Sequence, residues 1–126
     1  MEEMPLEWIE TPTHLIVKVS TVQLWVANAN SFKKKTLDKL KNLTAKGAPP
    51  YFLIDLEDVT FIDSLGLGSL LAIYKAYGAQ LPIALCIQHS FVKQVFDMTH
   101  MQNVMPIYPS VAEAMHALSL APQPKN

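Results

Sequence analysis

The chain has 126 residues, half of them hydrophobic, and a formal net charge of −1. This length supports one domain with a genuine core and leaves no room for a second. All ten basic residues are lysine, so the chain lacks the guanidinium group that commonly reads phosphate or guanine, and its charge does not favour a nucleic-acid partner.

The sequence indicates neither a membrane span nor an exported protein. No apolar stretch approaches the length that crosses a bilayer, and the N-terminus carries Glu2 and Glu3 where a signal peptide needs basic residues. The single cysteine, Cys86, lies in an apolar run and is interpreted as a buried small hydrophobe in a reducing compartment. These features predict a cytoplasmic protein that is not inserted in a membrane.

Two strands are predicted at the start of the chain, at residues 6–10 and 14–19. The second is rich in β-branched residues, and Thr11-Pro12 separates the two, so we expect an antiparallel hairpin at one edge of a sheet. His14 falls at the turn and is expected to be exposed or to act as a cap. Residues 22–26 are apolar enough for either a short strand or a buried loop.

A helix is predicted from about residue 30 or 31 to about residue 46. Apolar residues recur in it at helical spacing, and Gly47 follows as a left-handed stop. Its many lysines fall between the apolar positions. The simplest interpretation of these lysines is a solvated helix face, and a binding surface is the second.

A central strand is predicted at residues 51–56, because a continuous apolar run suits a strand that is covered on both faces. The next helix is predicted to follow Ser64 and to extend to about Tyr77, with Gly78 ending it. Gly66 and Gly68 are poor helix formers in its first turn. Their presence there predicts the close approach of another backbone segment or of a partner.

The following elements continue this alternation. Residues 81–87 are predicted to form a buried strand, and His89 and Ser90 are expected to cap a helix that runs to about residue 99. Residues 104–108 are predicted to form a short strand, which tolerates Pro106 because it lies at an edge.

A final helix is predicted to begin after Ser110 and to run through Leu118. Ser110 and Glu113 have the spacing of a capping box, in which the Glu side chain returns to the amide of the cap residue. Residues 121–126 are expected to be a disordered tail. The order of elements predicts an α/β fold, with a mixed, mostly parallel central sheet of about five strands and four helices.

Catalytic and nucleotide-binding motifs are incomplete in this chain. A hydrolase elbow around Ser64 needs glycine two residues before the serine, where Ile62 stands. The third glycine of a dinucleotide-binding motif falls on Leu71. The histidines lie on different predicted elements without metal-ligand spacing, so no enzyme activity, cofactor or metal site is predicted.

Ser64, preceded by Asp63, stands where a strand region passes into a helix. A helix N-terminus offers free amides and the positive end of a dipole, so it favours an anion, including a phosphate attached to the serine. The simpler interpretation is a helix cap, which is the commonest role of Ser and Asp at such junctions. A chain without arginine is better suited to carry a phosphate on its own serine than to bind a phosphate of another molecule.

Residues 54–56 and 59–62, followed by Asp63-Ser64-Leu65-Gly66-Leu67-Gly68, resemble the signature of the STAS domain of anti-sigma factor antagonists. Matching residues continue in the family's order through positions 72–75, the helix of Phe96 and positions 108–114. The resemblance covers roughly residues 14–118. It implies a STAS domain over residues 1–120 and a bacterial regulator of transcription instead of an enzyme.

The resemblance also implies a partner switch centred on Ser64. In that family, a serine kinase that is also an anti-sigma factor phosphorylates the matching serine, and a PP2C-type phosphatase removes the phosphate. The unmodified antagonist binds the anti-sigma factor and thereby frees the sigma factor. The partner-binding residues expected from this resemblance are Ser64 with Asp63, Leu65, Gly66, Leu67 and Gly68, together with Asp58 and Trp25.

Three positions differ from the family pattern. Leu65 stands where the family usually has Ser or Thr. Val22-Gln23-Leu24-Trp25 matches a Gly-x-Leu-Asp segment, so Val22 replaces the glycine and Trp25 replaces the acidic residue. For Trp25, a place in the core and a role as an exposed partner anchor both remain open. The alternative function is a STAS scaffold that does not switch, as a subunit of a stress-signalling assembly or of a transporter.

Overall fold

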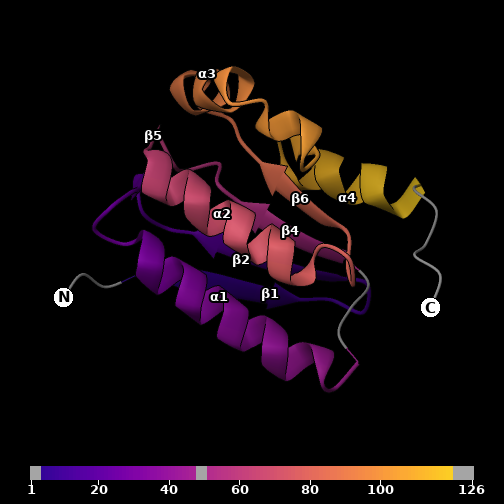
Figure 1. The fold of residues 1–126 in the computed structure, drawn as a ribbon. Coiled ribbons are helices and arrows are strands. Elements are labelled where there is room, and N and C mark those ends of the chain that lie inside the picture. The colour runs from indigo at the N-terminus through magenta and orange to yellow at the C-terminus, as the bar shows by residue number, and fades with distance from the viewer. Residues whose placement is uncertain (1–3, 48–50, 121–126) are drawn as a thin grey trace.

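A five-stranded sheet forms the middle layer of the structure, a computed structural model that describes residues 4–47 and 51–120 (Figure 1). In spatial order the strands are β1 (Leu6–Glu10), β2 (His14–Val19), β4 (Tyr51–Asp55), β6 (Ile83–Cys86) and β7 (Ile107–Tyr108). β1 pairs antiparallel with β2, and the other pairs are parallel. The predicted mixed, mostly parallel sheet with a hairpin at one edge is therefore confirmed.

Four helices cover the two faces of this sheet (Figure 1). One face packs against α1 (Ala29–Thr44) and α2 (Ser64–Tyr77), and side chains of α3 (Ser90–Met98) belong to the same apolar cluster. The other face packs against α4 (Val111–Leu120). The predicted α/β class and the four helices are confirmed.

The central strand β4 shows why the sheet needs both helix layers. All five of its residues are buried, and successive side chains point to opposite faces. Phe52 and Ile54 join the cluster with α1 and α2, whereas Leu53 joins the cluster with α4. A continuous apolar run is thus explained by a strand that is covered on both faces.

Two very short strands link the starts of α1 and α2. β3 (Gln23–Leu24) pairs in parallel with β5 (Phe61–Ile62), so the ambiguous segment 22–26 contains a short strand. The sequence did not predict β5. A strand of two residues is too short to show an alternating pattern, and pairing with a distant segment defines it.

Several boundaries differ from the predictions. α1 begins at Ala29 and ends at Thr44, and Gly47 has the predicted left-handed conformation with φ 80°. A 3₁₀ turn, η1 (Met101–Asn103), was not predicted, and it shortens the predicted strand at 104–108 to β7. The predicted tail at 121–126 lies outside the described residues.

Ser110 caps α4 as predicted, with one difference in the capping box. The amide of Glu113 donates to the hydroxyl oxygen of Ser110 at 3.2 Å, which is the expected bond. The carboxylate of Glu113 accepts from that same hydroxyl at 3.1 Å, where the sequence predicted a bond to the cap amide.

The expectation for His14 was wrong. Its side chain is 4% exposed, because β2 begins at this residue and the parallel register places it opposite Tyr51. The two rings lie 5.1 Å apart, and Nδ1 is 2.7 Å from the hydroxyl of Thr13. Burial lowers the pKa of His14 below its usual value, because the charged imidazolium loses hydration.

Candidate functional site

The carboxylate of Asp63 holds the start of α2 in place. As the cap residue, Asp63 accepts a hydrogen bond from the amide of Gly66 at 2.8 Å. Its second carboxylate oxygen accepts from the amide of Val26 at 2.8 Å. One side chain therefore ties the first turn of α2 to the loop between β3 and α1, so the helix-cap interpretation of this junction is correct for Asp63.

Gly66 and Gly68 differ in what surrounds them. A Cβ atom on Gly66 would overlap the carbonyl oxygen of Leu24 and would lie 2.7 Å from the side chain of Ile62. A Cβ atom on Gly68 would meet nothing within 4 Å. Close approach of the backbone thus explains Gly66, whereas Gly68 leaves open space on the surface of the helix.

Ser64 is the first residue of α2, and it is exposed. The amide of Gly66 is bound by the carboxylate of Asp63, and the amide of Leu67 donates to the carbonyl of Asp63. The first two amides of the helix, those of Ser64 and Leu65, therefore remain for solvent or for an anion. The first turn of α2 contains no acidic residue, but the carboxylate of the cap residue Asp63 lies at the helix start and would repel an anion on Ser64.

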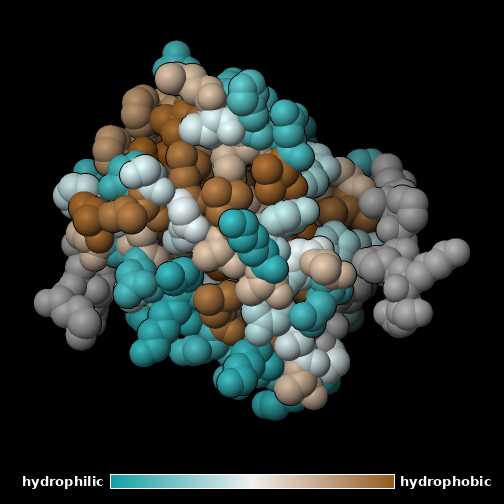
Figure 2. Space-filling view, viewed as in Figure 1, coloured by the Kyte–Doolittle hydropathy of each residue, from teal (hydrophilic) through white to brown (hydrophobic). Residues whose placement is uncertain are grey.

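Exposed hydrophobic side chains surround this helix start. Figure 2 shows hydrophobic surface gathered where α2 begins and towards α3. We call this surface the apolar patch, and its most exposed members are Val22 (61%), Val26 (59%), Leu65 (54%) and Phe91 (40%). Contiguous exposed apolar surface of this kind is typical of interaction sites.

Three aromatic rings form a row that includes one member of the apolar patch, Phe91. Phe61 stacks on Phe91 with ring centroids 5.8 Å apart, and Trp25 meets Phe61 edge-on at 6.4 Å. Trp25 is half-buried, and its indole nitrogen is buried without a hydrogen-bond partner among the described residues. Trp25 is therefore packed against Phe61 and only partly accessible, so its burial does not decide between the two open interpretations.

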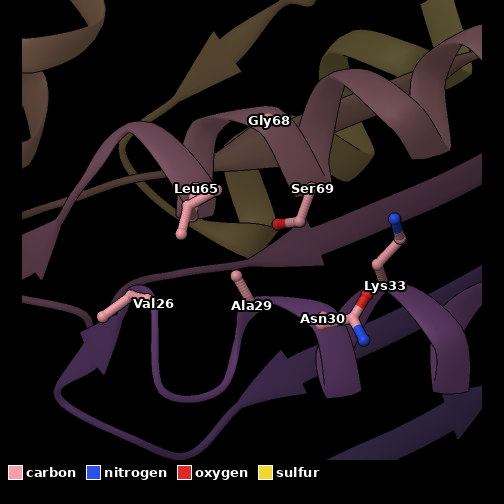
Figure 3. A pocket seen from close by; sticks show the side chains of 7 residues that line it. All are labelled: Val26, Ala29, Asn30, Lys33, Leu65, Gly68 and Ser69. Carbon is pink, nitrogen blue, oxygen red and sulfur yellow. The ribbon is translucent and has the colours of Figure 1, made fainter.

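A groove lies between α1 and α2 beside the apolar patch (Figure 3). Its volume is about 170 Å³, and its lining residues are Val26, Ala29, Asn30, Lys33, Leu65, Gly68 and Ser69. Figure 3 shows Leu65 pointing towards Val26 and Ala29 at one end, while Lys33 and Asn30 lie together at the other. Ala29, Asn30 and Phe91 were not predicted as site residues, since only tertiary packing brings them to this surface.

The other predicted site residues occupy different positions. Leu67 is half-buried and packs against the core. Asp58 is exposed, and its carboxylate lies 3.3 Å from Lys18 Nζ. That lysine also lies 3.8 Å from Asp55, and its hydrogen bond to Asp58 is the main cause that raises the pKa of Lys18. Asp58 therefore already has a cationic neighbour within the chain.

Burial also governs the titration of two groups near the end of β4. Desolvation is the main cause that raises the pKa of Glu57, with the charge of Asp55 adding to it. Burial raises the pKa of the Cys86 thiol to about 12. Cys86 is free and buried, which confirms the interpretation of this residue as a small hydrophobe.

The described part of the chain shows no arrangement of a hydrolytic site or a metal site. None of its histidines forms a hydrogen bond with Ser64, and His89 instead caps α3 by accepting from the amide of Phe91. No group of three or more potential metal-ligating side chains is found in residues 4–47 and 51–120. Across the same residues, no helix is both long and apolar enough to cross a membrane.

The sequence profile of the STAS domain matches residues 6–114. The chain belongs to the STAS domain family. A Thermotoga maritima protein that carries the provisional name anti-sigma factor antagonist is 31% identical over 102 residues, which are 80% of this chain and 87% of that protein. The recognition of the family from residues 54–68 is therefore confirmed, and homologues of this STAS domain are named anti-sigma factor antagonists.

Solved structures of such proteins share the fold of this STAS domain. An anti-sigma factor antagonist from Mycobacterium paratuberculosis superposes with a TM-score of 0.81 at 20% identity, covering 93% of this chain and 95% of that chain. The unphosphorylated form of the antagonist SpoIIAA superposes with a TM-score of 0.71 at 18% identity, covering 96% of this chain and 100% of that chain. A phosphorylated form of SpoIIAA from Bacillus has also been solved.

Proposed function

We propose that this STAS domain is an anti-sigma factor antagonist that acts by partner switching in the bacterial cytoplasm. Its unmodified form binds an anti-sigma factor that is also a serine kinase, and phosphorylation of Ser64 by that kinase ends the binding. A PP2C-type phosphatase restores the unmodified form. The observation that carries the proposal is the exposed Ser64 at the first residue of α2, beside the apolar patch.

The start of α2 can carry a phosphate without loss of the fold. A phosphoserine brings about −1.5 to −2 charges at neutral pH. The free amides of Ser64 and Leu65 and the helix dipole favour this charge, whereas the neighbouring carboxylate of Asp63 opposes it. The Asp63 carboxylate remains bound to its two amides, so the backbone beneath the phosphate stays in place.

The same phosphate opposes a partner that covers the apolar patch. Apolar surface such as that of Leu65 and Val26 contributes to binding when the partner excludes water from it. A doubly charged group in that interface must lose hydration, which is costly unless the partner supplies cations. A loss of about 3 kcal/mol would weaken the affinity by about two orders of magnitude.

The predicted partner-binding residues divide into two roles under this proposal. Ser64, Leu65 and Gly68 are exposed and offer direct contact, and Trp25 supports the apolar patch through Phe61. Asp63 and Gly66 fix the position of the helix start, Leu67 anchors it to the core, and Asp58 offers an exposed carboxylate next to Lys18.

The proposal is tested with a serine kinase of the anti-sigma factor type from the same organism. Incubation with ATP followed by peptide mass spectrometry should place one phosphate on Ser64 and none on Ser69, which lies in the same helix but is buried. Binding to the kinase should persist for Ser64→Ala and fall at least tenfold for Ser64→Asp. Absence of phosphate on Ser64 together with unchanged affinity of Ser64→Asp would refute the switch.

The second candidate function is a STAS scaffold that does not switch. Exposed Leu65 directly after Ser64, and half-buried Trp25 in place of the family's acidic residue, favour this candidate because both suit a permanent apolar contact. Such a scaffold would co-purify with a stress-signalling assembly or a membrane ATPase. Its Ser64 would remain unmodified in the purified complex.

A further inference from the structure

The groove between α1 and α2 has the size of a pocket for one side chain. Its volume of about 170 Å³ is close to that of an engineered cavity of about 150 Å³ that binds a single benzene ring. Pockets for drug-sized ligands begin at about 300 Å³. The groove therefore suits one aromatic or large aliphatic side chain of a protein partner.

The walls of the groove are apolar at one end and cationic at the other. Leu65 and Val26 are more than half exposed, so a side chain seated between them would remove apolar surface from water. At the other end, Lys33 forms no salt bridge with any described residue. No acidic residue belongs to the described lining, which leaves the charge of Lys33 uncompensated there.

Resting on the proposed function, we infer that the groove receives one apolar side chain of the partner, with a partner carboxylate beside it that pairs with Lys33. The apolar end supplies affinity through burial of surface. The cationic end supplies specificity, because a partner without an acidic group would leave the ammonium unpaired. The occupant is thus an acidic, apolar segment of the partner protein.

The position of Ser64 couples this groove to the switch. Ser64 and Gly68 are four residues apart on α2, so they lie on the same side of the helix, one turn from each other. A phosphate on Ser64 would stand one turn from Gly68 in the lining of the groove, near its apolar end. The partner's carboxylate would lie farther away, at Lys33, so its repulsion by the phosphate would be weaker than that of adjacent charges but would add to the release of the partner.

Titration of the unphosphorylated chain with two small probes tests this inference separately from the switch. The probes are 4-phenylbutyrate, which joins a ring to a carboxylate, and its neutral amide. Shifts of the backbone amide signals in ¹H–¹⁵N NMR spectra report binding. We expect both probes to perturb Val26, Lys33 and Gly68, and the carboxylate to bind about two- to fivefold more tightly than the amide.

Matched variants define the groove. Lys33→Gln should abolish the preference for the carboxylate, whereas Lys34→Gln, at an exposed position of the same helix outside the groove, should retain it. Gly68→Ala should weaken both probes because the added methyl group projects into open space at the groove. Equal affinity for both probes, or a preference that survives Lys33→Gln, would overturn the inference.

Two further outcomes identify what occupies the groove. Concentration-dependent shifts of the same amides without any probe would mean that a second copy of the chain covers the groove, and would overturn the assignment to an acidic partner. Phosphorylation of Ser64 by the kinase, combined with absence of probe binding, would refute the groove assignment while leaving the proposed switch intact. Probe binding without phosphorylation would refute the switch alone.

Discussion

One added methyl group should have opposite effects on stability at Gly66 and at Gly68. Alanine at Gly66 would overlap the carbonyl oxygen of Leu24, which belongs to the backbone of β3 and can move only if the paired β3 and β5 shift. Overpacking of this kind costs about 1–3 kcal/mol. The better helix propensity of alanine offsets up to about 1 kcal/mol of this cost. We expect a net loss of about 1–2 kcal/mol.

Gly68→Ala is the matched control, because the same substitution in the same helix meets nothing within 4 Å. It should raise the free energy of unfolding by about 0.5–1 kcal/mol, since alanine is the better helix former. In a domain of this size, that gain corresponds to an increase in Tm of about 2–4 °C.

Urea denaturation followed by circular dichroism measures both variants against the wild type. The expected order of stability is Gly68→Ala, then wild type, then Gly66→Ala. Equal or greater stability of Gly66→Ala than of the wild type would refute the close approach between α2 and β3. A loss of stability in Gly68→Ala would show that this position is packed, and would contradict the open surface described for it.

Three further predictions use the same stability assay or a chemical one. Asp63→Ala should lower the free energy of unfolding by about 2 kcal/mol, because the amides of Val26 and Gly66 lose a charged acceptor, and Asp63→Asn should lower it by less. Equal stability of the wild type and both variants would contradict the role of Asp63 in tying α2 to the loop before α1. Cys86 should resist iodoacetamide at pH 8 in the native protein and react in urea, since burial raises its pKa to about 12. Rapid labelling of Cys86 in the native protein, detected by mass spectrometry, would disprove this. Burial lowers the pKa of His14 in the folded protein, so the unfolded chain binds a proton more readily than the folded one. The free energy of unfolding should therefore be largest above pH 6.5 and should decline as the pH falls below that value. Comparison of urea curves at pH 7.5 and 5.5 should show a smaller decline for His14→Phe, and an identical decline in both proteins would refute the assignment.

The regular elements of this fold could be predicted because their patterns are local. The apolar run of β4 and the helical spacing of α2 are each readable within one segment, and the Gly78 stop lies directly after its helix. The start of α2 at Ser64 was also predictable, since the cap residue, the serine and the first-turn glycines are neighbours in the sequence.

The features that escaped prediction depend on contacts between distant segments. His14 is buried because the register pairs it with Tyr51, 37 positions later, and no local pattern encodes that register. β5 exists as a strand only through its pairing with β3. The groove needs Lys33 of α1 and Leu65 of α2 on facing helices, so its cationic and apolar ends cannot be recognised before the packing is known.

The rigidity of the helix start determines how the proposed switch would work. Asp63 ties α2 to the loop before α1, and the close contact at Gly66 ties it to β3, so a phosphate on Ser64 would be added to a backbone that is held from two sides. A flexible acceptor segment would respond to modification by changing its conformation. Here the modification changes mainly the charge of a surface whose apolar members stay where they were. Phosphorylation would therefore change the affinity of the partner without changing the backbone of the site. The exposed Leu65 and the groove beside it would determine which partner binds.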